Sequence, residues 1–278
     1  MSTTTAIGPR GRGPIPFAVD CEVMIRRNLV TLIRTPQMVL AAVFQPLMFV
    51  LTFSYVFGDA LGGDRYREFL IGGIMAQTVV FNFGFTAIGL NADLNSGMAE
   101  RFRALPMSRL GMVVGRTTSD VVINVIGLTV MSLAGLAVGW RISDGALFAI
   151  GSYATALVFG YALSWVAVII GVLSATATAA QSTLSIIVFP LCFVSSAFIP
   201  SRLLPGPLEV IASWNPVSAV ARSFRQGFGN PISVNPLVGE PATWASHHAQ
   251  AYTLICSAVI VAVMVPVTAR LLRRAATR

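Results

Sequence analysis

The sequence predicts an all-α integral membrane protein with six transmembrane helices, preceded by an amphipathic helix in the membrane plane. Composition is the first observation behind this fold class. Of the 278 residues, 55% are hydrophobic and only 11% are charged, and the mean hydropathy is +0.76, whereas a soluble domain carries about a quarter charged residues. Long uncharged runs are the second observation, and together they indicate that lipid covers much of the surface.

The uncharged runs locate the membrane spans. A bilayer core of about 30 Å needs about 20 helical residues. Four runs suit one span each, and the longer run between Asp144 and Arg202 suits two. Helix is expected because backbone amides in lipid must form hydrogen bonds within their own segment. The predicted spans are Gln37–Phe57, Phe69–Leu90, Ser119–Gly139, Ala146–Leu173, Gln181–Ile199 and Tyr252–Ala269.

The distribution of arginine predicts the orientation. The chain contains no lysine, so all 19 of its basic side chains are arginines. With both termini in the cytoplasm, 13 arginines fall in inner segments and 6 in outer segments, as the positive-inside rule requires. The net charge of +8 then reflects contact with anionic lipid headgroups rather than with nucleic acid. No cleavable signal is expected, because no short apolar core follows Arg10 and Arg12.

The expected organisation has four parts. They are a cytoplasmic tail over residues 1–16, an amphipathic helix over 17–36, a transmembrane domain over 37–270 and a second cytoplasmic tail over 271–278. In the amphipathic helix, one face carries Phe17, Cys21, Met24, Ile25, Leu29 and Leu32, and the opposite face carries Asp20, Arg27, Thr31 and Arg34. Pro36 favours a bend into the first span. The alternative is a plain cytoplasmic extension of that span.

Two connecting segments are unusual. The inner loop 91–109 contains a potential short helix in which Glu100, Arg101 and Arg103 face solvent. Such a segment suits docking into another protein, and the alternative is a polar turn that lies on lipid headgroups. The outer segment 200–250 is too apolar for a plain loop, since prolines divide it into short pieces and Trp214 and Trp244 suit the membrane interface.

Several kinds of chemistry are excluded by the residues present. Without lysine the chain cannot carry the P-loop motif, whose lysine contacts the nucleotide phosphates. The only histidines are the neighbours His247 and His248, which lack the spacing of a zinc site, and we expect no metal site and no catalytic residue. Asp120 is the one ionisable residue near a span, and Arg116 is its predicted partner in a structural ion pair. A transporter of this kind needs an external energy source, so we expect a protein that is not itself an enzyme.

Two blocks of sequence carry a resemblance to a known family. The first block comprises Leu70–Gln77, Asp93–Arg109 and Gly115-Arg116, and the second comprises Phe198–Pro200, Leu204-Pro205, Trp214–Ala219 and Arg222–Arg225. Together they resemble the permeases of type 2 ABC exporters, nearest to the daunorubicin-resistance branch. The resemblance implies that the first helix is a connecting helix and that a re-entrant external hairpin lies between helices five and six. The hairpin residues it implies are Pro200, Pro205, Trp214, Asn215 and Pro216.

The resemblance also implies partners and site residues. It implies a separate cytoplasmic ABC ATPase, two per complex, that binds ATP and Mg²⁺, and a second permease copy or a paralogue. The implied ATPase-coupling helix contains Glu100, Arg101, Phe102, Arg103, Leu105 and Pro106. The implied substrate path contains Gln45, Phe81, Asn82, Phe85, Phe189 and Phe193. These phenylalanines could instead pack against other helices or face lipid.

The expected function is therefore that of a permease subunit that exports hydrophobic drugs or lipids across a bacterial cytoplasmic membrane. Three alternatives stay open at this point. One is export of a lipid-linked polysaccharide, which the scarcity of tryptophan and tyrosine in the spans disfavours. The others are a self-contained channel or secondary transporter and a membrane scaffold that transports nothing.

Overall fold

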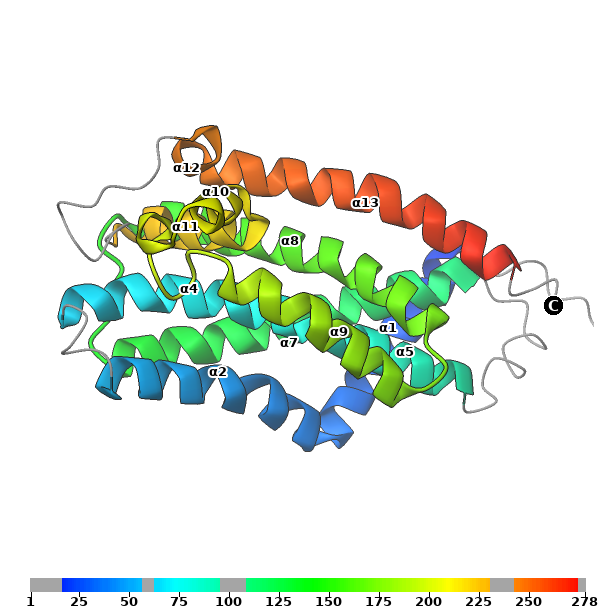
Figure 1. Ribbon diagram of the computed structural model, residues 1–278. Helices are drawn as coiled ribbons and strands as arrows, with labels where there is room; N and C mark the ends of the chain where they lie inside the picture. The colour runs from blue at the N-terminus through cyan, green and yellow to red at the C-terminus, as the bar shows by residue number, and fades with distance from the viewer. Residues whose placement is uncertain (1–16, 57–62, 96–108, 231–242, 275–278) are drawn as a thin grey trace, which may run out of the picture.

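The computed structural model describes residues 17–56, 63–95, 109–230 and 243–274, which form helices and turns with no strand among them. The long helices lie side by side along one common direction (Figure 1). In chain order the elements are α1 (Phe17–Arg34), α2 (Pro36–Val56), α4 (Asp64–Asn82), α5 (Gly84–Asn95), α7 (Arg109–Ala137), α8 (Ala146–Leu173), α9 (Ala177–Phe193), the 3-10 helix η1 (Ser201–Leu203), α10 (Pro207–Trp214), α11 (Pro216–Phe228), α12 (Trp244–His247) and α13 (Ala249–Arg274).

Four helical segments are long and apolar enough to cross a membrane. They are Asp64–Asn95, Val113–Ala137, Ala146–Leu173 and Ala249–Leu271. Two shorter apolar helices, Ala42–Val56 and Ala177–Phe193, lie where the first and fifth spans were predicted. Each predicted span thus overlaps a helical segment, and α8 has the predicted bounds. The second predicted span is divided between α4 and α5, and the fifth continues past the end of α9 at Phe193. The number of membrane crossings itself stays a prediction.

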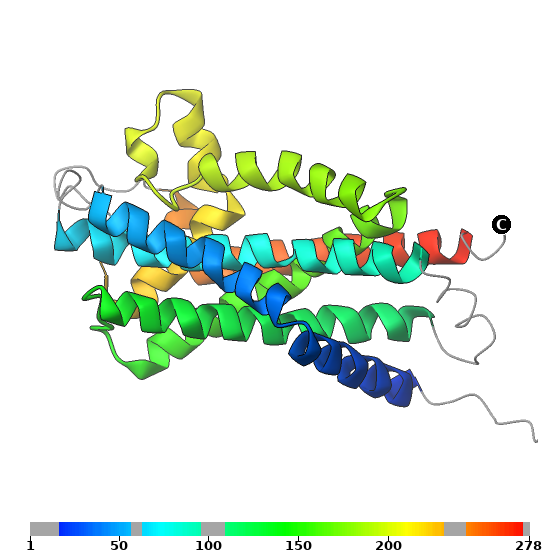
Figure 2. The same cartoon turned by 90° about the horizontal axis from the view of Figure 1, so that it is seen from below.

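The two ends of the bundle carry different elements. At one end lie α1, the end of α5, the start of α7 and the C-terminal end of α13, and we call this the α1 end (Figures 1 and 2). At the other end lie α10, α11 and α12, and we call it the α11 end. Helix α1 and the C-terminal end of α13 therefore lie at the same end of the bundle, as an even number of spans requires.

The helix predicted over Phe17–Arg34 is present as α1 and packs against α7. Met24 is 2% exposed, and Gly115 of α7 lies against it so closely that an added Cβ would come within 2.5 Å of the Met24 Cβ. Thr31 and Arg34 are exposed, in agreement with the predicted polar face. Thr35 is the single non-helical residue before α2.

The outer segment is more deeply buried than the sequence suggested. Helix α11 packs against α4, α8 and α13, and Arg222 and Arg225 are 0% exposed. Arg225 donates from Nε to the carbonyl of Phe69 over 2.8 Å and from Nη2 to the carbonyls of Ser196 and Ala197 over 2.8 and 3.0 Å. Backbone carbonyls inside the protein therefore surround Arg225, an environment that the sequence did not indicate.

Candidate functional site

A groove of about 270 Å³ opens between α2, the α4–α5 pair and α9, and we call it the central groove. Five of the six residues predicted for the substrate path line it. Its lining residues are Ala42, Gln45, Pro46, Phe81, Asn82, Gly84, Phe85, Ile88, Gln181, Leu184, Ser185, Val188 and Phe189. The structure thus brings residues from three predicted spans to one place. Whether substrate occupies the groove stays a prediction.

Each helical segment beside the central groove contains a proline or a break near the groove. Pro46 lies inside α2 and Pro190 inside α9, and a proline in a helix removes one hydrogen bond to the carbonyl four residues earlier. The second predicted span is divided at Phe83, where α4 ends and α5 begins with Gly84. A proline or a helix break therefore lies in each of the three helical segments that line the groove.

The sixth predicted residue, Phe193, lies outside the groove lining but continues a row of aromatic rings from it. Phe81 contacts Phe189 edge to face at 5.6 Å between ring centroids, and Phe189 stacks on Phe193 at 6.1 Å. Phe193 stacks in turn on Phe198 at 5.5 Å, and Phe198 contacts Phe53 at 5.2 Å and Phe49 at 5.8 Å. The row connects α4 through α9 to α2.

Sequence reasoning missed three members of this row, namely Phe49, Phe53 and Phe198. A signal for the first two was available, since Gln45, Phe49 and Phe53 follow one another at four-residue steps and so share one face of α2. Phe198 lies after the end of α9, so helical spacing gives no signal for it. Its position depends on how the chain turns toward η1.

The central groove has an uncharged lining. Its lining combines phenylalanine rings with amide and hydroxyl groups, and no ionisable side chain is among the lining residues. Asn82 is held in place by donating to Oδ1 of Asn124 over 3.2 Å. Such a surface can bind an amphipathic molecule through apolar contact and a few hydrogen bonds.

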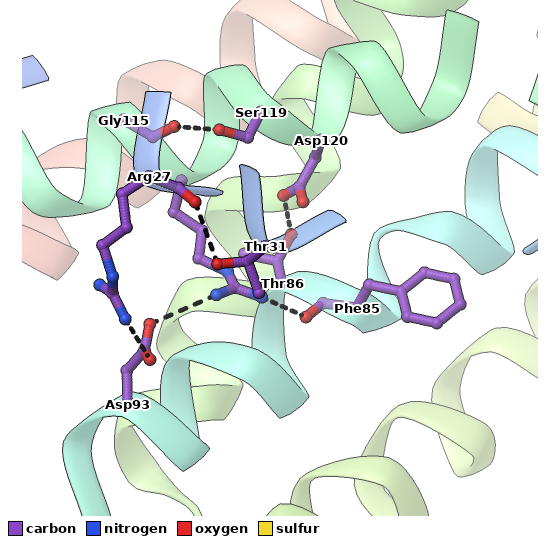
Figure 3. A network of polar contacts seen from close by, with 9 residues as sticks. Arg27, Thr31, Phe85, Thr86, Asp93, Gly115, Ser119 and Asp120 are labelled. Atoms are coloured by element: carbon purple, nitrogen blue, oxygen red, sulfur yellow. Dashed lines mark hydrogen bonds and ion pairs between the residues drawn. The ribbon is translucent and has the colours of Figure 1, made fainter. Parts of the chain in front are cut away.

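A network of polar contacts lies at the α1 end of the bundle (Figure 3). Asp93 of α5 lies between two arginines, with Arg27 of α1 at 3.1 Å and Arg116 of α7 at 3.4 Å. Arg116 also donates to the carbonyl of Phe85 over 3.0 Å. Three helices are therefore joined through one carboxylate.

The predicted ion pair between Arg116 and Asp120 is wrong. Arg116 pairs with Asp93 instead, and Asp120 accepts a hydrogen bond from the hydroxyl of Thr86. The four-residue spacing places Arg116 and Asp120 on one side of α7, but α5 packs there and offers both of them closer partners. Asp120 is 3% exposed, and its structural role stays a prediction.

The residues predicted to couple to an ATPase lie outside the described residues. Glu100, Arg101, Phe102, Arg103, Leu105 and Pro106 fall between the end of α5 at Asn95 and the start of α7 at Arg109. The end of α5 is fixed by Asn91, which donates to the carbonyls of Gly171 and Ser174 over 3.1 and 2.6 Å. The C-terminal end of α5 therefore lies next to the turn between α8 and α9.

The predicted hairpin residues lie in or beside the short helices at the α11 end of the bundle. Asn215 is the residue between α10 and α11. Its Nδ2 donates to the carbonyls of Leu191 and Val194, and its Oδ1 accepts from the Val217 amide, so it ties the start of α11 to the end of α9. Pro216 is the first residue of α11. Trp214 is 47% exposed and Pro205 is also exposed, whereas Pro200 is buried.

A helical bundle with four segments long and apolar enough to cross a membrane is typical of a multi-pass membrane protein. The chain belongs to the ABC-2 type transporter family, whose model matches residues 20–228.

Three relatives agree with this assignment. The chain is 31% identical over 240 residues to the daunorubicin resistance ABC transporter permease protein DrrB1 of Streptomyces coeruleorubidus, covering 86% of this chain and 80% of that protein. It is 24% identical over 220 residues to the putative transport permease ycf38 of Porphyra purpurea, covering 76% and 74%. It is 21% identical over 216 residues to the corresponding protein of Cyanophora paradoxa, covering 75% and 74%.

Proposed function

We propose that this chain is the membrane-spanning permease subunit of an ABC exporter that moves hydrophobic drugs or lipids outward. Membership of the ABC-2 type transporter family, with 31% identity to a drug-resistance permease over most of the chain, is the observation that carries the proposal. The energy comes from ATP, which a separate cytoplasmic ATPase hydrolyses with Mg²⁺. Two ATPase subunits and a second permease copy or paralogue complete the transporter.

The central groove supports the proposed substrate class. An uncharged lining of phenylalanine rings with amide groups at Gln45, Asn82 and Gln181 matches a ligand that is largely apolar and carries a few hydrogen-bonding groups. The aromatic row from Phe81 to Phe198 offers such a ligand continuous apolar contact along α9. We infer that substrate moves along this row between α2 and α9.

The proposed topology has six membrane crossings, with the α1 end in the cytoplasm of a bacterial cell. In this arrangement α1 is a connecting helix in the membrane plane, and residues 96–108 lie on the cytoplasmic side where they contact the ATPase. The segment that contains α10 and α11 is the external re-entrant hairpin. The common position of α1 and the C-terminal end of α13 at one end of the bundle agrees with this topology.

The test is affinity purification of the tagged protein from its native membrane in mild detergent. We expect an ABC ATPase to co-purify in stoichiometric amount, with ATP hydrolysis that hydrophobic substrates stimulate in liposomes. Charge reversal at Glu100 or Arg103 should abolish this stimulation and leave folding intact, whereas Arg202→Glu, an exposed position at the α11 end, should preserve it. Purification without an ATPase, together with substrate flux that needs no nucleotide, would instead identify a self-contained transporter.

A further inference from the structure

Helix α1 carries a groove lined by arginines on the side where it does not contact α7. Its volume is about 420 Å³, and its lining residues are Val23, Arg26, Arg27, Val30, Thr31 and Arg34. We call it the arginine groove. The spacing of three, four, seven, eight and eleven residues from Val23 places these side chains on one face of the helix. Arg26 and Arg34 are exposed, as are the two valines, at 52% and 39%.

The position of α1 in the chain brings this face to the membrane surface. Only Thr35 separates Arg34 from Pro36, the first residue of the apolar helix α2. Arg26 lies eight residues before Arg34, a distance of about 12 Å along a helix. The whole groove, from Val23 to Arg34, therefore lies within about 20 Å of the point where α2 begins.

The arginine groove offers two kinds of contact that one phospholipid molecule would use together, one for its phosphate and one for its apolar part. Guanidinium groups bind phosphate oxygens with paired hydrogen bonds and a full positive charge. Exposed valine side chains between them suit the glycerol backbone and the first methylene groups of an acyl chain. The position of the groove just before the apolar helix α2 favours a lipid over an acidic protein surface.

We propose that the arginine groove is a binding site for the phosphate of an anionic phospholipid at the membrane surface. Arg27 connects this site to the rest of the bundle, because it lines the groove and also pairs with Asp93 of α5 at 3.1 Å. A lipid bound there lies next to the network that joins α1, α5 and α7. Lipid composition would thus act on the position of α1 against the bundle.

The proposal is tested by native mass spectrometry of the purified protein after exchange into mixed micelles of phosphatidylglycerol and phosphatidylcholine. The variants are Arg26→Gln and Arg34→Gln, and the matched control is Arg270→Gln, which removes an exposed arginine from α13 at the same end of the bundle. An arginine near a lipid surface contributes about 1 kcal/mol, or about a fivefold change in affinity. We expect each groove variant to retain about fivefold less phosphatidylglycerol and Arg270→Gln to equal the wild type. Arg26→Lys should restore retention only in part, because lysine keeps the charge but not the paired hydrogen bonds.

Each other outcome overturns the proposal in a distinct way. Equal loss in Arg270→Gln would mean diffuse electrostatic attraction rather than a site. Displacement of phosphatidylglycerol by excess inorganic phosphate would indicate a soluble phosphate ligand instead of a lipid. Unchanged lipid retention with weaker binding of the co-purifying ATPase in the groove variants would assign the surface to a protein partner. Glutamine keeps the helix propensity of these exposed positions, so elution volume and circular dichroism should match the wild type.

Discussion

Replacing Arg225 with methionine should destabilise the protein more than any substitution of an exposed arginine. The side chain is 0% exposed and joins α11 to α4 and to the turn after α9 through the carbonyls of Phe69, Ser196 and Ala197. Its guanidinium carbon also lies 3.5 Å from the centroid of the Phe69 ring. Methionine has a similar length and is apolar, so the substitution removes the donors while leaving little empty space.

The magnitude follows from the carbonyls that lose their donor. Ser196 and Ala197 lie in the turn after α9, where no helical hydrogen bond satisfies them in place of Arg225, and each buried carbonyl left without a donor costs about 1–3 kcal/mol. The middle of that range gives about 4 kcal/mol for the two. Phe69 adds less, because its carbonyl belongs to α4 and takes part in the helix. Arg225→Lys keeps the charge but supplies one compact donor group, so we expect about half the loss.

The assay is unfolding by sodium dodecyl sulfate in mixed micelles, followed by circular dichroism, with Arg202→Met as the control. Arg202 is exposed in η1, and its substitution should change the free energy of unfolding by less than about 0.5 kcal/mol. If Arg225→Met proves as stable as Arg202→Met, the hydrogen bonds to the turn do not hold α11 in place. The physical argument for its buried position would then be refuted.

Three further predictions concern other contacts. Gly73→Ala should destabilise by about 1–3 kcal/mol, because an added Cβ would overlap the carbonyl oxygen of Ala197, as thermal unfolding in detergent would reveal. Asp93→Asn should increase hydrogen exchange in α1, measured by mass spectrometry, because it removes the negative charge between two arginines. Phe85→Ala in the central groove should raise the drug concentration for half-maximal ATPase stimulation about tenfold, the equivalent of about 1.4 kcal/mol.

Each of these has a matched control. Gly151→Ala has only Gln250 Nε2 within 4 Å of the new Cβ, at 3.8 Å, and should stabilise α8 by up to about 1 kcal/mol. Asp64→Asn removes an ion pair at an exposed carboxylate and should leave exchange in α1 unchanged. Phe44 is 60% exposed outside the groove lining, and Phe44→Ala should leave drug stimulation unchanged. A control that behaves like its paired variant would contradict the corresponding argument.

Helix positions could be predicted from the sequence because lipid imposes a simple requirement on the chain. A spanning helix needs a long uncharged run, and the bounds predicted for Ala146–Leu173 coincide with α8. The amphipathic spacing of Phe17–Arg34 likewise coincides with α1. Prediction was less accurate for the segment after α9, where prolines indicate breaks but not the direction of the chain between them.

The candidate site could be predicted only in part. Residue types and a family resemblance selected Gln45, Phe81, Asn82, Phe85 and Phe189, and these five line one groove. The resemblance also selected Phe193, which lies beyond the groove lining in the aromatic row. Which of these residues line the groove depends on how α2, the α4–α5 pair and α9 pack against one another. Spacing within any one helix does not determine that packing.

The sequence by itself determined the class of protein, the places of its apolar helices and the absence of a nucleotide-binding lysine. These follow from composition and from the length of uncharged runs, which are local properties of the chain. Only the tertiary structure decided which charged groups meet, because that depends on the packing of helices distant in sequence. Arg116 therefore pairs with Asp93 rather than Asp120, and Arg225 lies buried among backbone carbonyls rather than at the surface.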